Sequence, residues 1–525
     1  MTIEPASIGI GRTLGRAADA CEREIPNLHD FVAPGSPPKL AEEAGKRDGP
    51  AIQTPVIRQN PYRQLVRRRF SEPLLLLLIF VFGVWMWDNY TGNPAGPQPD
   101  QWELAMRKAD RDLRLAAGTA NLPAWIRPAL GISSLEETLA TTEASFEQMV
   151  RTLHGHRHHQ QGPEPDAALQ DEGAYAFAVI IALRQNGNPA AGPFRQVGLP
   201  GPPPPEPILS RIIAGQEHWW DLEYLKALDI PETEMASRMV NARTEYLTTN
   251  AIKARGAVLA LALGGLIFVP GTLLAFLRPE TSARRKRVNY SHRWLLNFGL
   301  GVFLLAFLAH IGFSITFNAA LQQAAPVSSD GVSRPLMSMP VFITLDGLTR
   351  FLPAFIALGL LFRRSRHAVS RLGIAGPIDI RMILGCFAIL QVIEFGLRMT
   401  LDRSGTPDPL GGLQVAEDGM WGLLFGIVSA CIAAPIAEEI LYRGVLFRSL
   451  ANRIHLAPAI IISSVVFAIV HFYPFSSLVL VGAVGAACAL CYLRSGTLLT
   501  AIGLHALYNV AIKIPEWIVY HTPLS

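Results

Sequence analysis

Long apolar stretches, separated by polar segments rich in arginine, dominate the pattern of the chain. The first covers residues 71–90, and the others cover 256–277, 294–317, 340–362, 381–400, 419–441, 457–473, 476–493 and 498–520. A helix of about 20 apolar residues crosses the hydrocarbon core of a bilayer, so the pattern predicts an all-α polytopic membrane protein with about nine transmembrane helices. Half of all residues are hydrophobic and 17% are charged, which is typical of membrane spans combined with sizeable soluble parts.

Two long segments lack apolar stretches of spanning length. Residues 1–70 are rich in Pro and Arg without periodicity and predict a disordered tail. Residues 91–254 carry helical periodicity, for example in "LEETLATTEASFEQMVRTL", and predict a mainly helical soluble domain between the first and second spans. Four histidines of this segment could hold a transition metal, but we favour an exposed, solvated loop for His154, His156, His158 and His159.

Basic residues between the apolar stretches orient them. Arg67, Arg68 and Arg69 precede the first span, and arginine clusters follow the second and fourth spans. By contrast, Arg334 is the only basic residue in the loop 318–339. Cytoplasmic loops carry the excess of Lys and Arg, so we expect a cytoplasmic N-terminus and an extracytoplasmic 91–254 domain. Residues 255–379 then form spans two to four with basic cytoplasmic loops. We expect the lipid bilayer as a partner and no nucleic acid.

Charged residues inside the apolar stretches are costly and must be compensated or used. Three acid–arginine pairs lie four residues apart, the spacing that places both side chains on one helix face: Asp346 and Arg350, Glu394 and Arg398, and Glu439 and Arg443. The third pair leaves the adjacent Glu438 as a buried carboxyl without a cation nearby in the sequence, and such a carboxyl is suited to general-base catalysis. Pro435 lacks an N–H group and should loosen the same helix.

Histidine and asparagine side chains occur in two later spans. "FAIVH" places Phe467 and His471 on one helix face, and "HALYN" does the same for His505 and Asn509. A glutamate with a histidine can polarise water, and a histidine with an asparagine can donate to an oxyanion, as hydrolysis of an acyl bond requires. We expect no metal because HExxH is absent, although two histidines and a carboxylate leave zinc as an alternative.

Three motifs in this region resemble those of a known family, the CAAX prenyl protease and bacteriocin-processing (CPBP, or Abi) intramembrane proteases. The family patterns EExxxR, FxxxH and HxxxN appear in order as Glu438, Glu439 and Arg443, as Phe467 and His471, and as His505 and Asn509. The resemblance covers roughly residues 380–520 and implies an intramembrane endopeptidase acting on a membrane-associated protein or peptide.

The resemblance also implies roles for the motif residues. Glu438 would activate water with the assistance of His471, and His505 and Asn509 would stabilise the oxyanion. The remaining motif residues would support the site: Glu439, Arg443 and Phe467. No cofactor is expected, and the expected location is a bacterial inner (cytoplasmic) membrane.

Two other classes of protein share some of these features. Intramembrane glutamates, histidines and interrupted helices also mark transporters and proton-coupled carriers, although no inverted repeat is evident here. A non-catalytic membrane scaffold is the third interpretation, and the complete motif set argues against it.

Overall fold

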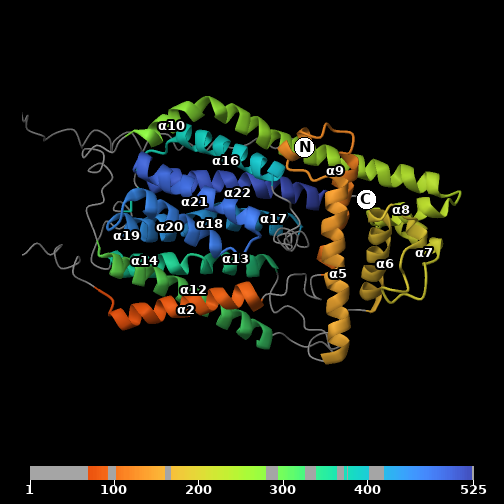
Figure 1. Ribbon diagram of the computed structural model, residues 1–525, viewed down its shortest axis with the longest axis horizontal. Helices are drawn as coiled ribbons and strands as arrows, with labels where there is room; N and C mark the ends of the chain where they lie inside the picture. The colour runs from red at the N-terminus through yellow and green to blue at the C-terminus, as the bar shows by residue number, and fades with distance from the viewer. Residues whose placement is uncertain are drawn as a thin grey trace, which may run out of the picture. The chain divides into compact units, whose positions relative to one another are not determined.

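The computed structural model of the chain describes residues 69–92, 102–159, 167–278, 294–324, 339–362, 372–374, 376–400 and 419–522. These residues form helices and connecting turns, and they contain no strand, which confirms the predicted all-α class (Figure 1). The tail predicted for residues 1–70 lies outside them, apart from its last two residues.

Each predicted span coincides with an apolar helix. Seven helical stretches are long and apolar enough to cross a membrane: Glu72–Thr91, Thr233–Leu277, Leu296–Leu321, Ile380–Thr400, Met420–Ala451, Phe475–Ser495 and Leu498–His521. Two shorter apolar helices, Gly347–Phe362 and Leu456–Ile469, cover the remaining predicted spans. The chain is therefore a polytopic membrane protein by helix length and composition, and the count of nine spans stays a prediction.

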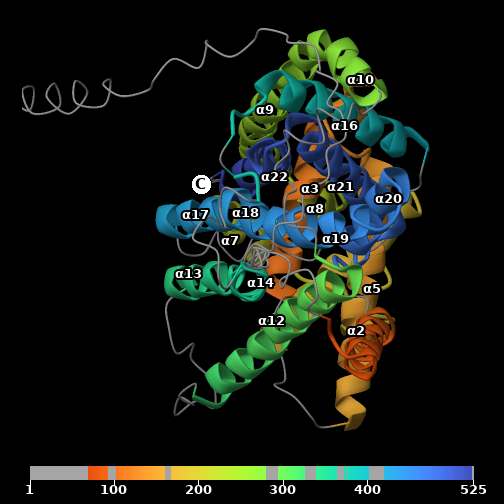
Figure 2. The ribbon, with the colours of Figure 1, turned by 90° about the vertical axis from the view of Figure 1, so that its left-hand side faces the viewer.

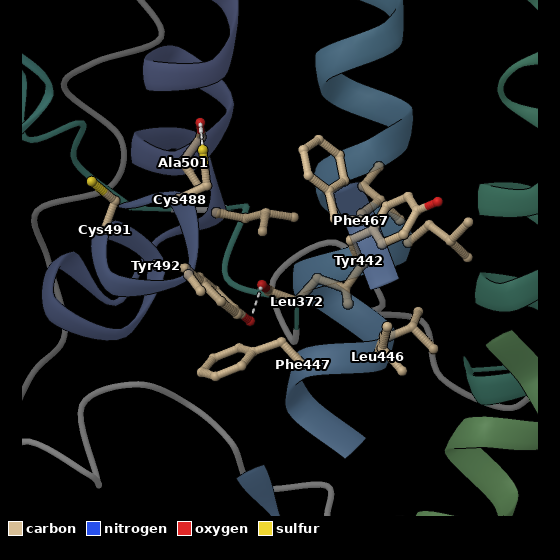
Figure 3. Close-up of a cluster of buried hydrophobic side chains, with 14 of the residues drawn as sticks. Leu372, Tyr442, Leu446, Phe447, Phe467, Cys488, Cys491, Tyr492 and Ala501 are labelled. Atoms are coloured by element: carbon tan, nitrogen blue, oxygen red, sulfur yellow. Dashed lines mark hydrogen bonds between the residues drawn. The ribbon is translucent and has the colours of Figure 1, made fainter. Parts of the chain in front are cut away.

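A first hydrophobic core is formed mainly by the second half of the chain. It joins α2 (Glu72–Gly92), α12 (Leu296–Ala324), α14 (Leu352–Phe362), α16 (Ile380–Thr400), α20 (Leu456–Ile469), α21 (Phe475–Ser495) and α22 (Leu498–His521). Two further helices precede the motif region, α13 (Met339–Thr349) and α17 (Gly419–Val428). The C-terminal helices α20, α21 and α22 lie close together in both ribbon views (Figures 1 and 2). Aromatic side chains such as Tyr442, Phe447 and Phe467 fill the space beside the buried Cys488 and Tyr492 (Figure 3).

A second hydrophobic core falls mainly within the segment predicted to be soluble, with Val519 and Tyr520 of α22 added to it. It is built from α3 (Trp102–Gly118), α5 (Leu135–His159), α6 (Ala167–Arg184), α7 (Pro205–Ala214), α8 (Trp219–Leu228) and α9 (Thr233–Gly265), with the short α4 (Ile126–Ala129) and η2 (Pro189–Ala191). Trp102 and Trp220 are among its largest fully buried side chains. The expected boundary at residue 254 falls inside α9, which continues through η3 (Leu266–Phe268) into α10 (Val269–Leu277).

One local expectation for this segment was wrong. Helix α5 extends to His159, so residues 154–159 are helical and do not form a loop. Their neighbours from Leu135 onward sustain a helical pattern that simply continues through the histidines. The side chains of these histidines are outside the described residues.

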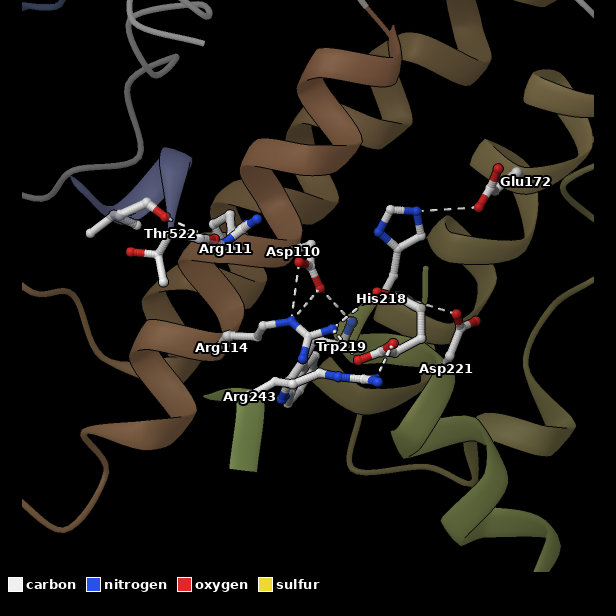
Figure 4. A network of polar contacts seen from close by, with 11 residues as sticks. Asp110, Arg111, Arg114, Glu172, His218, Trp219, Asp221, Arg243 and Thr522 are labelled. Carbon is white, nitrogen blue, oxygen red and sulfur yellow. Dashed lines mark hydrogen bonds and ion pairs between the residues drawn. The ribbon is translucent and has the colours of Figure 1, made fainter. Parts of the chain in front are cut away.

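The second core also contains a network of buried charged groups (Figure 4). The guanidinium group of Arg114 donates from Nε to Asp110 at 2.9 Å and from Nη2 to Glu217 at 3.3 Å. Arg243 donates to the other carboxylate oxygen of Glu217 at 2.6 Å, and Arg211 donates to Asp221 at 2.7 Å. This network ties α3, α7, α8 and α9 together through charge-assisted hydrogen bonds.

Candidate active site

The first motif lies on a continuous helix whose regular pattern is interrupted twice. Residues Met420–Ala451 are helical, but α18 (Ala434–Glu439) is flanked by two π-helical segments, η5 (Ser429–Ala433) and η6 (Ile440–Phe447). A short α19 (Arg448–Ala451) ends the helix. π segments inside α-helices are found frequently at functional sites. Both glutamates therefore lie on an irregular stretch, as the position of Pro435 led us to expect.

Asn509 compensates for part of this irregularity. The N–H of Ala434 donates five residues back, to the carbonyl of Ser429, and the following residue, Pro435, has no N–H to give to Ala430. The side-chain amide of Asn509 donates to the Ala430 carbonyl instead, at 2.8 Å. Helix α22 thereby supports the backbone immediately before the two glutamates.

Glu439 is completely buried and holds two partners on one oxygen. Its Oε1 accepts from Arg443 Nη1 at 2.7 Å, which confirms the pairing predicted from the spacing. The same oxygen lies 2.9 Å from Nδ1 of His505 on α22. Because a carboxylate oxygen can only accept, Nδ1 of His505 carries a hydrogen and donates a hydrogen bond to Glu439. The other ring nitrogen, Nε2, lies on the side of the ring away from Glu439. This link between the first and third motifs was not apparent from the sequence.

Glu438 occupies a different environment from its neighbour. Its side chain is 28% exposed, whereas that of Glu439 is 0% exposed. Its Oε2 lies 3.8 Å from Nε2 of His505, and its carboxylate interacts electrostatically with His471 and Tyr442. Glu438 therefore lies beside His505, acts electrostatically on His471 and remains accessible. The expectation that this carboxyl is buried was wrong, because its side chain is partly exposed.

Phe467 is the aromatic centre of the site. Its ring lies 4.3 Å from the Arg443 guanidinium carbon, and it contacts the rings of His471 and His505 edge-on at 4.9 Å and 5.7 Å. Its backbone carbonyl accepts a hydrogen bond from Nδ1 of His471 at 2.6 Å. The lone pair of His471 is therefore on Nε2, where it can accept a proton.

Two further residues shape the site and were missed in the sequence. Tyr442 packs its ring against Phe467 at 5.0 Å, from the motif helix itself. Gly485 on α21 approaches so closely that a Cβ there would lie 3.2 Å from Arg443 Nη2 and from the Phe467 ring. The small-residue stretch "GAVGAAC" around Gly485 was the available signal for this close approach.

The side chains provide little support for a metal. Among the residues that the structure describes, no group of three His, Cys, Asp or Glu side chains is arranged to hold a metal ion. His505 and His471 each use Nδ1 for a hydrogen bond within the protein. Zinc thus remains the alternative named above, and metal independence stays a prediction.

Comparison with known proteins agrees with the motif resemblance. Neither a search of curated proteins nor a search of solved structures found a match. A family model, described as type II CAAX prenyl endopeptidase Rce1-like, matches residues 420–511. All seven motif residues fall in this range, together with the π segments and the Gly485 approach. Residues 420–511, called the Rce1-like domain below, are therefore similar to the family of type II CAAX prenyl endopeptidases.

Proposed function

We propose that the chain is an intramembrane endopeptidase that hydrolyses a peptide bond in a membrane-associated protein. The observation that carries the proposal is the contrast between two adjacent carboxylates. Glu439 is buried and neutralised by Arg443, whereas Glu438 is accessible, lies beside His505 and acts electrostatically on His471. The match of residues 420–511 to a CAAX-type protease family supports the same activity in general.

Water activation is assigned to Glu438 with His471. A carboxylate that is not committed to a structural ion pair can take a proton from water as the water attacks the carbonyl carbon. Nε2 of His471 carries the free lone pair, so it can accept a hydrogen bond from the same water. The proton is later delivered to the leaving amine, and the chain needs no covalent intermediate.

Oxyanion stabilisation is assigned to His505 with Asn509. Because Nδ1 of His505 donates to Glu439, a second proton on Nε2 gives an imidazolium whose charge Glu439 stabilises. The Nε2–H can then donate to the developing oxyanion. Asn509 uses one amide hydrogen for Ala430 and has a second to offer. Such donors act strongly in a site that excludes bulk water.

The test combines a cellular and a purified assay of Glu438→Gln. Comparative membrane proteomics of wild type and variant cells should show at least one intact membrane-associated protein accumulating only in the variant. Purified wild type should cleave either that protein or an internally quenched, farnesylated CAAX peptide, whereas the variant should not. The control is Glu516→Gln, which removes a carboxylate from the α22 pair with Lys513 outside the motifs. Equal cleavage by the wild type and Glu438→Gln would refute the proposal.

We also propose an orientation, with residues 91–254 outside the cytoplasm. The arginine clusters support it, since cytoplasmic loops retain basic residues. A reporter active only outside the cytoplasm should be active when fused near residue 200 and silent when fused near residue 285. The opposite pattern would reverse the proposed orientation.

A further inference from the structure

The turn after α20 has an unfavourable backbone conformation immediately beside His471. Phe472 has a φ of +53°, in the left-handed region that bulky L-residues rarely adopt. Such a conformation persists where the surroundings hold it, and it is found preferentially at functional sites. The residues that hold Phe472 therefore bear on the position of His471.

Two aromatic side chains from the first apolar helix hold this turn. The rings of Trp85 and Tyr90 on α2 contact the Phe472 ring edge-on, at centroid distances of 5.2 Å and 5.0 Å. The Tyr90 hydroxyl also donates to the backbone carbonyl of Ile469 at 2.8 Å. Helix α2 thus contacts the turn on both sides of His471.

A second series of aromatic contacts connects α2 to the same site through α12. Trp85 packs against Phe307 at 5.4 Å, and Phe307 stacks on Phe303 at 6.1 Å. Phe303 meets Tyr442 at 5.5 Å, and Tyr442 in turn packs against Phe467, whose carbonyl binds His471. The first route from α2 thus ends at the residues flanking His471, Ile469 and Phe472, and the second ends at the His471 ring through Phe467.

We propose that Trp85 and Tyr90 are positioning residues for His471, so that α2 belongs to the catalytic machinery. Residues 72–92 lie outside the range matched by the protease family model, 420–511, so the match itself assigns no role to this helix. The inference rests on the proposed function for its catalytic meaning. Its structural content is that loss of the α2 contacts lets the turn relax and moves Nε2 of His471 away from Glu438.

The kinetic test compares three variants of the full chain. Trp85→Ala and Tyr90→Phe should lower kcat by about tenfold or more with little change in KM, since misplacement by about 1 Å can cost up to about 10²-fold. Trp85→Phe, which keeps an aromatic ring, should restore most of kcat. Trp87→Ala is the matched control, because Trp87 lies on the same helix with 72% of its surface exposed. An unchanged kcat in Trp85→Ala and Tyr90→Phe would overturn the inference.

A readout independent of cleavage separates this inference from the proposed function. Diethylpyrocarbonate modifies an accessible imidazole nitrogen, and mass spectrometry can follow its rate at His471. Trp85→Ala and Tyr90→Phe should change this rate severalfold, and Trp87→Ala should not. In Phe472→Gly, which tolerates the positive φ, adding Trp85→Ala should cause a smaller further change than it causes in the wild type, because only the route through Phe307 remains to be lost. If the wild type cleaves no probe, the proposed function fails, but these rates still decide whether α2 positions His471.

Discussion

The chain contains two buried clusters of acids and arginines, and they differ in one respect. In the second core, each of three carboxylates has an arginine partner and a second donor or cation. Asp110 binds Arg114 and the Trp219 N–H, Glu217 binds Arg114 and Arg243, and Asp221 binds Arg211 and the His218 N–H. In the Rce1-like domain, Glu439 also has an arginine partner and a second one, His505, but the adjacent Glu438 has no arginine partner among the described residues.

This difference separates a structural cluster from a catalytic one. Both contain an acid four residues before an arginine, as in Asp110 with Arg114 and Glu439 with Arg443, and both pairs are buried. Burying charge is tolerated where partners and hydrogen bonds compensate each group. A saturated cluster has no group left for chemistry, whereas Glu438 keeps an accessible carboxylate beside two histidines. The extra acid, and not the ion pair, distinguishes the proposed active site.

The sharpest way to break the comparison is to remove one carboxylate charge from each cluster. Glu438→Gln should lower the cleavage rate by about 10²–10⁴-fold, the usual contribution of a general base, with an unchanged melting temperature. Asp110→Asn should instead lower the melting temperature, because Arg114 loses one of its two carboxylate partners, and leave the rate per folded molecule unchanged. Cleavage assays and thermal unfolding of both purified variants test this. A Glu438→Gln protein that melts early, or an Asp110→Asn protein that folds but is inactive, would contradict the distinction.

Glu439→Gln should combine both effects. It leaves Arg443 buried without its carboxylate, and breaking a buried pair in this way costs about 3–5 kcal/mol. It also removes the group that orients His505, so the folded fraction should be inactive. Replacing the pair together, as Glu439→Leu with Arg443→Met, should recover stability but not cleavage. A stable, active Glu439→Gln protein would show that the pair is dispensable.

The elements of the site that depend on local spacing could be predicted from the sequence. The i,i+4 rule gave the Glu439–Arg443 pair, and the missing N–H of Pro435 indicated the irregular helix. The same rule correctly paired Glu394 with Arg398 on α16, where the guanidinium donates to the carboxylate. The Asp346–Arg350 pairing falls partly outside the described residues, because the Asp346 side chain is not among them.

Contacts between distant segments could not be predicted in this way. The bond from His505 to Glu439 joins residues 66 positions apart, and the bond from Asn509 to Ala430 joins residues 79 apart. Tyr90 and Ile469 are 379 positions apart. Spacing within one helix carries no information on which faces of different helices meet. The histidine cluster of 154–159 shows the complementary error, since composition favoured a loop where the helix continues.

A smaller effect on stability is expected from replacing Asn509, whose side chain donates a hydrogen bond to a backbone carbonyl. Asn509→Ala should leave the half-buried Ala430 carbonyl without its donor and cost about 1 kcal/mol, the usual net contribution of a hydrogen bond. Pro435→Ala restores a backbone N–H near that carbonyl, so the double variant should recover part of the loss. Denaturation in detergent of the wild type, the two single variants and the double variant gives the coupling free energy between Asn509 and Pro435. Purely additive losses would show that Asn509 does not compensate for Pro435.

The smallest effect concerns His218 and Glu172, a pair at the edge of the polar network of the second core. Nε2 of His218 lies 3.2 Å from Glu172, and the His218 ring stacks on Trp220 at 4.5 Å. Burial opposes the charged imidazole, but Glu172 and the nearby Asp110 and Asp221 outweigh it, so the pKa of His218 is raised above 6.5. The hydrogen bond from His218 outweighs burial for Glu172, whose pKa is lowered below 4.5.

The two shifts define the pH range in which this pair stabilises the fold. A raised pKa gives His218 a contribution that is complete below 6.5 and is lost as the pH rises through the folded-state pKa. A lowered pKa gives Glu172 a contribution that is present above 4.5 and is lost as the pH falls through its folded-state pKa. The melting temperatures of wild type and His218→Gln should therefore differ most between pH 4.5 and 6.5 and converge in alkaline buffer. Arg114→Met, whose guanidinium stays charged throughout, should lower the melting temperature by a similar amount across the range. A His218→Gln deficit that grows in alkali would reverse the assigned sign and remove the pair from the stabilising part of the cluster.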